Sequence, residues 1–354
     1  MFQELLNTVS LNISTVRSII KTNDRLRKIA FGEGAVKKQE LEPDVVFIIS
    51  TLMQDIPRAS DWRIYDHCAV VTQLYAIYER FVEDLVTHWI GLLPEMFPLY
   101  LQLEDRVRDT HQMGVGQLLL NLKKNRFQHL CIEKVVRGLF QGVTRENKYE
   151  LVADAFLLHE QNLRKEVLEK LFADAGISNA WNWVEKHRAV KYFVEEIRAR
   201  ENTAEGELHE LISYRNDAAH GAPIDNVLGS SALLELCYFI ETLCQALAEL
   251  VTYRVISRKS LIGQARESGL ITDWYKQRRA AVARVKETTL AVGGSLFLVS
   301  EARSYCQLVT IKSIMIQESG KDVEKEQVEI TSESEVGLKF DTDAKKELRL
   351  CIVE

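Results

Sequence analysis

Residues 61–93, DWRIYDHCAVVTQLYAIYERFVEDLVTHWIGLL, carry the clearest structural signal in the chain. Their apolar side chains recur every three or four positions, the spacing that gathers them on one face of an α-helix. The members of this stripe are Ile64, Val71, Leu74, Ile77, Tyr78, Phe81, Leu85 and Trp89. Ser60 or Asp61 can cap the start of the helix, and we expect Pro94 to end it. A helix of about thirty residues is typical of a helical bundle.

The chain up to about residue 290 favours further helices, because it holds few prolines and its apolar residues keep helical spacing. We expect helices over residues 115–124, 162–175, 182–200, 205–220 and 230–255. The last of these is strongly apolar on one face and is the best candidate for a central core helix. Gly221 and Pro223 form a stop signal after His220.

Short runs rich in Val, Ile and Thr follow Gly293 and Gly294, and such runs between turn residues are typical of β-strands. We expect strands over residues 306–316, 323–330, 336–340 and 348–353, with turns at 320–322 and 341–345. The fold class is therefore mainly α, followed by a small C-terminal antiparallel β-domain. The expected domains are a helical domain at residues 1–255, a basic helical connector at 256–292 and a small β-barrel-like domain at 293–354.

The composition, 46% hydrophobic and 27% charged, is typical of a soluble globular protein. The net charge of -6 excludes a globally basic nucleic-acid binder, so a local patch must bind any polyanion. We find neither a secretion signal nor an uncharged apolar run of about 18 residues, and expect a cytoplasmic protein without a membrane span. The six cysteines form no C-x-x-C pair, which argues against a zinc site or a disulfide framework.

Residues 214–221, YRNDAAHG, are the strongest candidate for chemistry. On a helix, Asn216 and His220 share one face, and the long side chain of Arg215 reaches over the same surface. A histidine at a helix end can titrate near neutral pH, and an arginine can bind a phosphate with two donors. The set suits attack of a ribose 2′-hydroxyl on the adjacent phosphate, which needs a proton acceptor, a proton donor and a cation, but no metal.

A capped helix end is the alternative interpretation of these residues. In that case His220 donates to a backbone carbonyl group, and Arg215 pairs with Glu207 or Glu210. The spacing of one arginine and one histidine does not decide between the two interpretations.

The context of the motif resembles the HEPN superfamily, an all-helical group that includes many prokaryotic ribonucleases. Its signature is an Arg, a polar residue, a short spacer and a His near the end of the penultimate core helix. Residues 75–83, YAIYERFVE, look like the early long helix of bacterial HEPN proteins, which carries a Glu facing the active site. The likeness, to the RiboL-PSP/MAE type, covers residues 60–255 with a long helical insertion between 95 and 200.

This resemblance implies a role for each matching residue. Arg215 and His220 would be the catalytic pair, Asn216 would orient or assist them, and Glu79 would be an accessory acid. It also implies a homodimer with two motifs in one cleft, no metal or cofactor, and products with a 2′,3′-cyclic phosphate and a 5′-hydroxyl. A toxin or anti-phage defence effector of this kind would act on RNA and need a restraining partner, such as an antitoxin.

The main basic stretch, residues 254–286, interleaves cations with two aromatic residues and can follow an RNA backbone. The RNA contacts expected there are Arg258, Lys259, Lys276, Arg278 and Arg279. A solvated connecting helix is the alternative. The strands after it look like the β-barrel used as the second domain of translation GTPases, which would imply a module that docks RNA or protein.

The first functional hypothesis is therefore a metal-independent endoribonuclease of HEPN type. The alternatives are a catalytically silent HEPN-fold scaffold that binds RNA or protein, and a nucleotide-binding regulator. Residues 114–117, GVGQ, give the last of these no support as a triphosphate loop, because the lysine and the preceding strand are missing.

Overall fold

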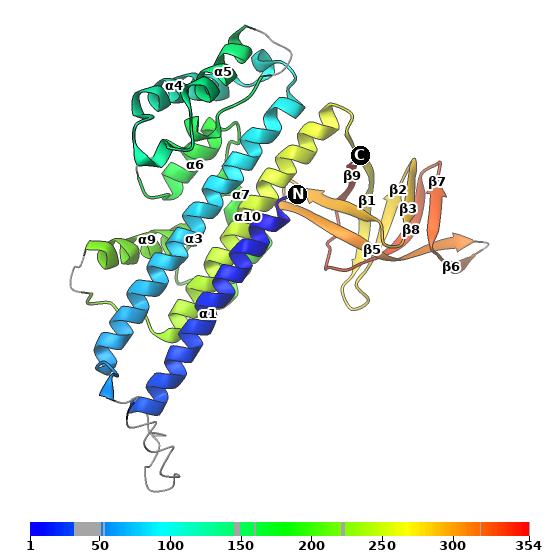
Figure 1. Cartoon of the computed structure of the whole chain (residues 1–354). Helices are drawn as coiled ribbons and strands as arrows, with labels where there is room; N and C mark the ends of the chain where they lie inside the picture. Colours follow the sequence, from blue (N-terminus) through cyan, green and yellow to red (C-terminus); the bar gives the residue numbers. More distant parts are fainter. Residues whose placement is uncertain are drawn as a thin grey trace.

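The computed structural model describes residues 1–31, 51, 54–144, 149–158, 161–220, 224–318 and 320–353. This part of the chain is mainly helical and ends in an antiparallel β-barrel, as expected (Figure 1). The stop signal expected at Gly221 and Pro223 lies outside the described residues.

Three long helices form the centre of the helical part. These helices, α1 (Gln3–Phe31), α3 (Ala59–Met96) and α10 (Ser230–Leu261), lie side by side (Figure 1). The apolar stripe predicted for α3 faces inward, since Val71, Leu74 and Leu85 are completely buried. By length and composition α10 could cross a membrane, but most of its apolar stretch is buried in the protein, as in a core helix.

Helix α3 is longer than the sequence pattern indicated. It begins after Arg58, and neither Ser60 nor Asp61 caps it. Pro94 lies inside the helix rather than at its end. The helix ends at Met96 because Pro98 follows, and a proline disfavours helical geometry in the residue before it.

The described residues of the insertion up to residue 174 include three α-helices near one end of α3 (Figure 1). These are α4 (Asp105–Asn121), α5 (Ile132–Val143) and α6 (Lys165–Asp174). The short turns η2 (Tyr100–Gln102) and η4 (Ala153–Ala155) pack against α5 and α4, respectively. The buried side chain of His111 on α4 fixes this packing: its Nε2 accepts the Val152 N–H at 3.2 Å, and its Nδ1 lies 3.1 Å from the Tyr100 hydroxyl.

The prediction of one helix over residues 182–200 is wrong. The helix is interrupted at His187, whose ψ angle of 134° is extended. The segment instead forms α7 (Ala180–Lys186), α8 (Arg188–Tyr192) and the π-turn η5 (Phe193–Ile197). Helix α9 (Ala204–His220) follows and matches the predicted helix closely.

The described residues of the C-terminal region, 264–318 and 320–353, form nine strands. They are β1 (Ala265–Tyr275), β2 (Ala280–Val285), β3 (Thr288–Ala291), β4 (Ser295–Ser300), β5 (Tyr305–Glu318), β6 (Lys321–Lys325), β7 (Gln327–Ile330), β8 (Ser334–Phe340) and β9 (Arg349–Val353). The main sheet has the order β4-β9-β1-β2-β8-β5-β6, and pairing of β4 with β5 closes it into a barrel. Strands β3 and β7 pair separately, so the single strand expected over 323–330 is two strands in different sheets.

The prediction of a basic helical connector at residues 256–292 is wrong. Helix α10 ends at Leu261, Gly263 turns the chain with a positive φ of 76°, and the barrel begins at Ala265 rather than at 293. Strand β2 shows the reason, because its Ala281, Ala283 and Val285 point into the barrel core between more exposed neighbours. This alternation has a period of two, but the small alanines at two buried positions and the apolar Val282 between them obscured it.

A buried ion pair fixes the barrel on the bundle. Glu249 of α10 accepts two hydrogen bonds from the Arg188 guanidinium, at 2.6 and 2.7 Å. The same carboxylate accepts the backbone N–H of Cys306 in β5 at 3.1 Å, and Arg188 lies 4.2 Å from the Tyr305 ring centroid. Burial by itself raises the pKa of Glu249, but hydrogen bonds from His187 and Arg188 outweigh it and lower the pKa to about 2.

Candidate active site

Helix α9 carries the motif residues along the flank of α3. Its Leu211 and Ile212 are completely buried and anchor the helix. Arg215 and Asn216 on the following turn are half-buried, whereas His220 at the end of the helix is exposed. The helix therefore holds the first two side chains in place and leaves the third open to a substrate.

A cavity of about 680 Å³ brings the three motif residues together with one segment of the insertion. Its lining residues are Gln161, Asn162, Arg164, Arg215, Asn216 and His220. None of these six residues is acidic, so the cavity suits an anion. Two segments about fifty positions apart in the chain thus form the two walls of one site.

The amide of Asn216 connects the two walls. Its Oδ1 accepts hydrogen bonds from Arg215 Nη1 at 3.1 Å and from Asn162 Nδ2 at 3.0 Å. Asn216 therefore holds the Arg215 guanidinium beside the insertion without neutralising its charge.

Arg215 does not form the ion pair that the capped-helix interpretation requires. Glu207 bonds to Arg198 and Asn202 instead, and Glu210 also accepts from Asn202. The Arg215 guanidinium lies 5.0 Å from the centroid of the Tyr75 ring on α3, a cation–π contact. An arginine held by a ring and an amide keeps its full positive charge for a ligand.

Glu79 reaches the motif only through Tyr75. The Tyr75 hydroxyl donates to Glu79 Oε1 at 2.9 Å and accepts the Leu163 N–H at 3.1 Å. Burial and the neighbouring Glu79 carboxylate raise the pKa of Tyr75, so the phenol stays neutral. Glu79 does not line the cavity, and its position is that of a residue that orients Tyr75 beneath Arg215.

Arg164 and His220 are the open groups of the site. Both side chains are exposed, and neither has a hydrogen-bond or ion-pair partner among the described residues. One guanidinium and one imidazole are thus unengaged beside the positioned Arg215. Chemically, the cavity can bind a phosphate between two arginines and offer it a group that takes up and gives off protons.

Sequence reasoning missed Asn162, Arg164 and Tyr75. Asn162 and Arg164 were assigned to the predicted helix 162–175, but α6 begins only at Lys165, and both residues lie in the segment before it. Tyr75 was noted only as part of an aromatic-rich stretch, since nothing in the sequence shows which ring lies beneath an arginine.

None of the described residues of the basic stretch, 254–286, lines this cavity of the same chain. Lys276, Arg278 and Arg279 are exposed around the β1–β2 turn, on the barrel, whereas α9 lies on the opposite side of the long helices (Figure 1). Arg258, on the last turn of α10, packs 3.9 Å from the Phe97 ring centroid and donates to a backbone carbonyl. The half-buried Lys259 adjoins it.

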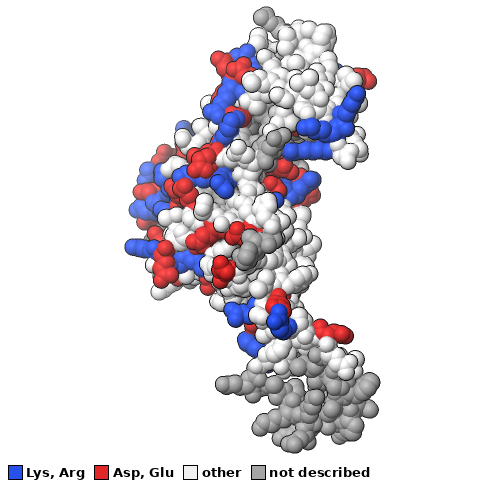
Figure 2. All heavy atoms as spheres, turned by 90° about the vertical axis from the view of Figure 1, so that its left-hand side faces the viewer, with Lys and Arg blue, Asp and Glu red and all other residues white. Residues whose placement is uncertain are grey.

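On the face that carries α9, the residues that the structure describes form no broad basic surface around the motif (Figure 2). Figure 2 shows Lys and Arg interspersed with Asp and Glu over the middle of the face that carries α9 and the insertion. Its upper part is largely uncharged. Attraction of a polyanion to this face is therefore local to the cavity, as the net charge of -6 predicts.

Comparison with known protein families adds an independent observation. The family model described as RiboL-PSP-HEPN matches residues 38–253, more than half of the 354 residues. The chain belongs to the RiboL-PSP-HEPN family. The matched range spans α3, the whole insertion, α9 and most of α10, so the insertion is part of the family domain. No curated protein and no solved structure matches the chain.

Proposed function

We propose that this RiboL-PSP-HEPN protein is a metal-independent endoribonuclease. The observation that carries the proposal is the cavity in which Arg215, Asn216 and His220 meet Arg164, with no acidic side chain among the described residues that line it. Two arginines without an acidic partner among the described residues suit an anionic substrate. Membership of the family supports a nuclease, and the cavity supplies the chemistry.

The reaction is attack by a ribose 2′-oxygen on the adjacent phosphorus. A bond forms between the 2′-oxygen and phosphorus, and the bond from phosphorus to the 5′-oxygen breaks. The 2′-hydroxyl gives up a proton, and the leaving 5′-oxygen gains one. Arg215 and Arg164 stabilise the charge that builds on the non-bridging oxygens, while Asn216 keeps Arg215 in place.

A homodimer is part of the proposal. The reaction moves two protons, whereas the described residues that line the cavity of one chain include a single histidine, His220. The exposed position of His220 lets a second copy bring its own motif to the same cleft. One imidazole then accepts the proton of the 2′-hydroxyl, and the other donates to the leaving oxygen.

The direct test is cleavage of end-labelled single-stranded RNA in EDTA. We expect the wild type to cleave, and His220→Ala and Arg215→Ala to lose at least about a hundredfold in rate. His209→Ala is the matched control, because it removes an exposed histidine of the same helix outside the motif cavity. If the wild type and both motif variants behave alike, the proposal fails and an RNA- or protein-binding scaffold is favoured.

The biological setting follows from the chemistry in the same proposal. A metal-independent ribonuclease in the cytoplasm attacks the RNA of its own cell unless it is restrained. We therefore place the protein among toxin or anti-phage defence effectors with an inhibitory partner. Co-expression of a neighbouring gene product that restores growth would support this placement, and harmless expression of the active enzyme alone would oppose it.

A further inference from the structure

A second and larger cavity adjoins the proposed active site. It has a volume of about 980 Å³ and lies between α4, η4 and α6. Gln161 lines both this cavity and the motif cavity, so the two are neighbours on one surface. A ligand bound at the motif can therefore extend directly into the larger cavity.

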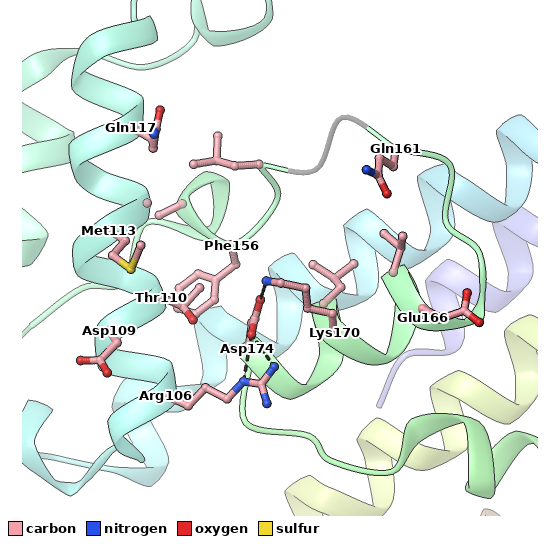
Figure 3. A pocket seen from close by; sticks show the side chains of 15 residues that line it. Arg106, Asp109, Thr110, Met113, Gln117, Phe156, Gln161, Glu166, Lys170 and Asp174 are labelled. Atoms are coloured by element: carbon pink, nitrogen blue, oxygen red, sulfur yellow. Dashed lines mark hydrogen bonds and ion pairs between the residues drawn. The ribbon is translucent and has the colours of Figure 1, made fainter.

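The walls of the larger cavity are predominantly apolar. Met113 from α4 and Phe156 after η4 face α6 across it (Figure 3). Leu158, Val167 and Leu171 complete this lining. Met113 is 74% exposed, so its thioether is available to a ligand rather than packed in the core.

The charged side chains at the rim argue against a phosphate in this cavity. The Asp174 carboxylate forms ion pairs with Arg106 Nη2 at 2.7 Å and with Lys170 Nζ at 2.5 Å. Both cations that line the cavity are therefore already paired (Figure 3). Asp109 and Glu166 add two further carboxylates. The rim is thus slightly acidic, and a phosphate would be repelled from it.

An uncharged planar group suits the cavity better. A nucleobase has an apolar face for the exposed Met113 and polar edges for the lining amides Gln117 and Gln161. We propose that this cavity is a nucleobase subsite, which takes the base beside the phosphate held by Arg164 and Arg215. The inference rests on the proposed function and adds to it a contact with the base of a single-stranded RNA.

The geometry separates the two parts of a nucleotide. The motif cavity, lined by two arginines and no acid, holds the phosphate. The neighbouring cavity, with paired cations and apolar walls, holds the base. A base inside this cavity is unstacked from its neighbours, so an RNA duplex is a poorer ligand than a single strand.

The test uses 2′-O-methyl RNA, which cannot be cleaved by attack of a 2′-hydroxyl, so binding is measured independently of catalysis. The probes are a 2′-O-methyl adenosine hexamer and an abasic hexamer with the same number of phosphates. We expect the wild type to bind the base-bearing hexamer about tenfold more tightly. Met113→Ala should lower that affinity about fivefold and leave the abasic hexamer unaffected.

Leu120→Ala is the matched control, since Leu120 is an equally exposed apolar residue of α4 that does not line the cavity. Photo-crosslinking with a 4-thiouridine version of the hexamer should label Met113, Thr110 or Phe156. Equal affinity for the two hexamers, no binding of either, or crosslinks only outside the cavity overturns the subsite. Equal affinity is also the result expected of a cavity that binds a protein segment instead. Cleavage of ordinary RNA would still stand, so the two proposals fail separately.

Discussion

At the residue scale, the surroundings of Arg215 decide what the motif can do. The sequence predicted that Asn216 and His220 share a helix face and that the side chain of Arg215 reaches over it, and all three line one cavity. It did not predict that the Tyr75 ring would lie beneath the guanidinium. Local spacing determines which residues share a face, but partners from distant segments depend on tertiary packing.

Replacing Arg164 tests the wall that the insertion contributes. We expect Arg164→Ala to reduce kcat/KM for RNA cleavage about tenfold or more, because a charge-assisted bond to the phosphate is lost. The slope of log affinity for RNA against log salt concentration should become shallower by about one, because one phosphate contact is lost. Arg25→Ala, at an exposed arginine of α1, is the control and should change neither value. Identical behaviour of the two variants would remove Arg164 from the site.

Tyr75→Phe separates the ring from its hydroxyl. The ring remains beneath Arg215, but the buried Leu163 N–H loses its acceptor. We expect a loss of about 1–3 kcal/mol in the free energy of unfolding, measured by urea denaturation. Cleavage at a temperature where the variant is folded should fall less than in Arg215→Ala. A loss as large as that of Arg215→Ala would assign the hydroxyl a direct part in the reaction.

At the element scale, sequence patterns succeeded where one face of a helix was strongly apolar. Helices α3, α9 and α10 were predicted because each has such a face or a clear end signal. Strands β1 and β2 were missed because their buried positions include small residues such as Ala281 and Ala283. The break at His187 was missed too, since the surrounding composition still favours a helix.

The packing of the insertion should weaken in acid because of His111. Burial lowers the pKa of His111 to about 4, so the folded state favours the neutral ring. Its stabilising contribution is complete above the unfolded pKa of about 6.5 and is lost as the pH falls towards 4, by about 3 kcal/mol in total.

Urea denaturation of the wild type at pH 7 and pH 5 measures this effect, and His111→Gln should reduce the difference between the two pH values. His88→Gln, at an exposed histidine of α3, should leave the difference unchanged. An equal pH dependence in the His111 variant would contradict the assignment.

At the scale of the whole molecule, the protein is one helical domain of the RiboL-PSP-HEPN family joined to a barrel by a buried ion pair. The sequence predicted both parts but not their boundary or their junction. Glu249 and Arg188 look like ordinary surface charges in the sequence, and only the docked barrel buries them.

Removing Glu249 should therefore destabilise the whole molecule. Glu249→Ala leaves the half-buried Arg188 and the buried N–H of Cys306 without their shared acceptor, and we expect a loss of about 3–5 kcal/mol in the free energy of unfolding. Because the folded-state pKa of Glu249 is about 2, this stabilisation persists above pH 4.5 and is lost only as the pH falls from 4.5 towards 2. Glu133→Ala, which breaks an exposed ion pair on α5, should cost at most about 1 kcal/mol. Similar costs for both variants would show that the junction does not stabilise the fold.

The chemical ends of the cleavage products test the central claim most directly. After incubation of RNA with the wild-type protein in EDTA, mass spectrometry should find 2′,3′-cyclic phosphate and 5′-hydroxyl ends. A 2′-O-methyl RNA of the same sequence should stay intact, and His220→Ala should give no product above background. Products with 5′-phosphate ends, or cleavage of the 2′-O-methyl RNA, would contradict attack by the 2′-hydroxyl in the cavity of Arg215 and His220.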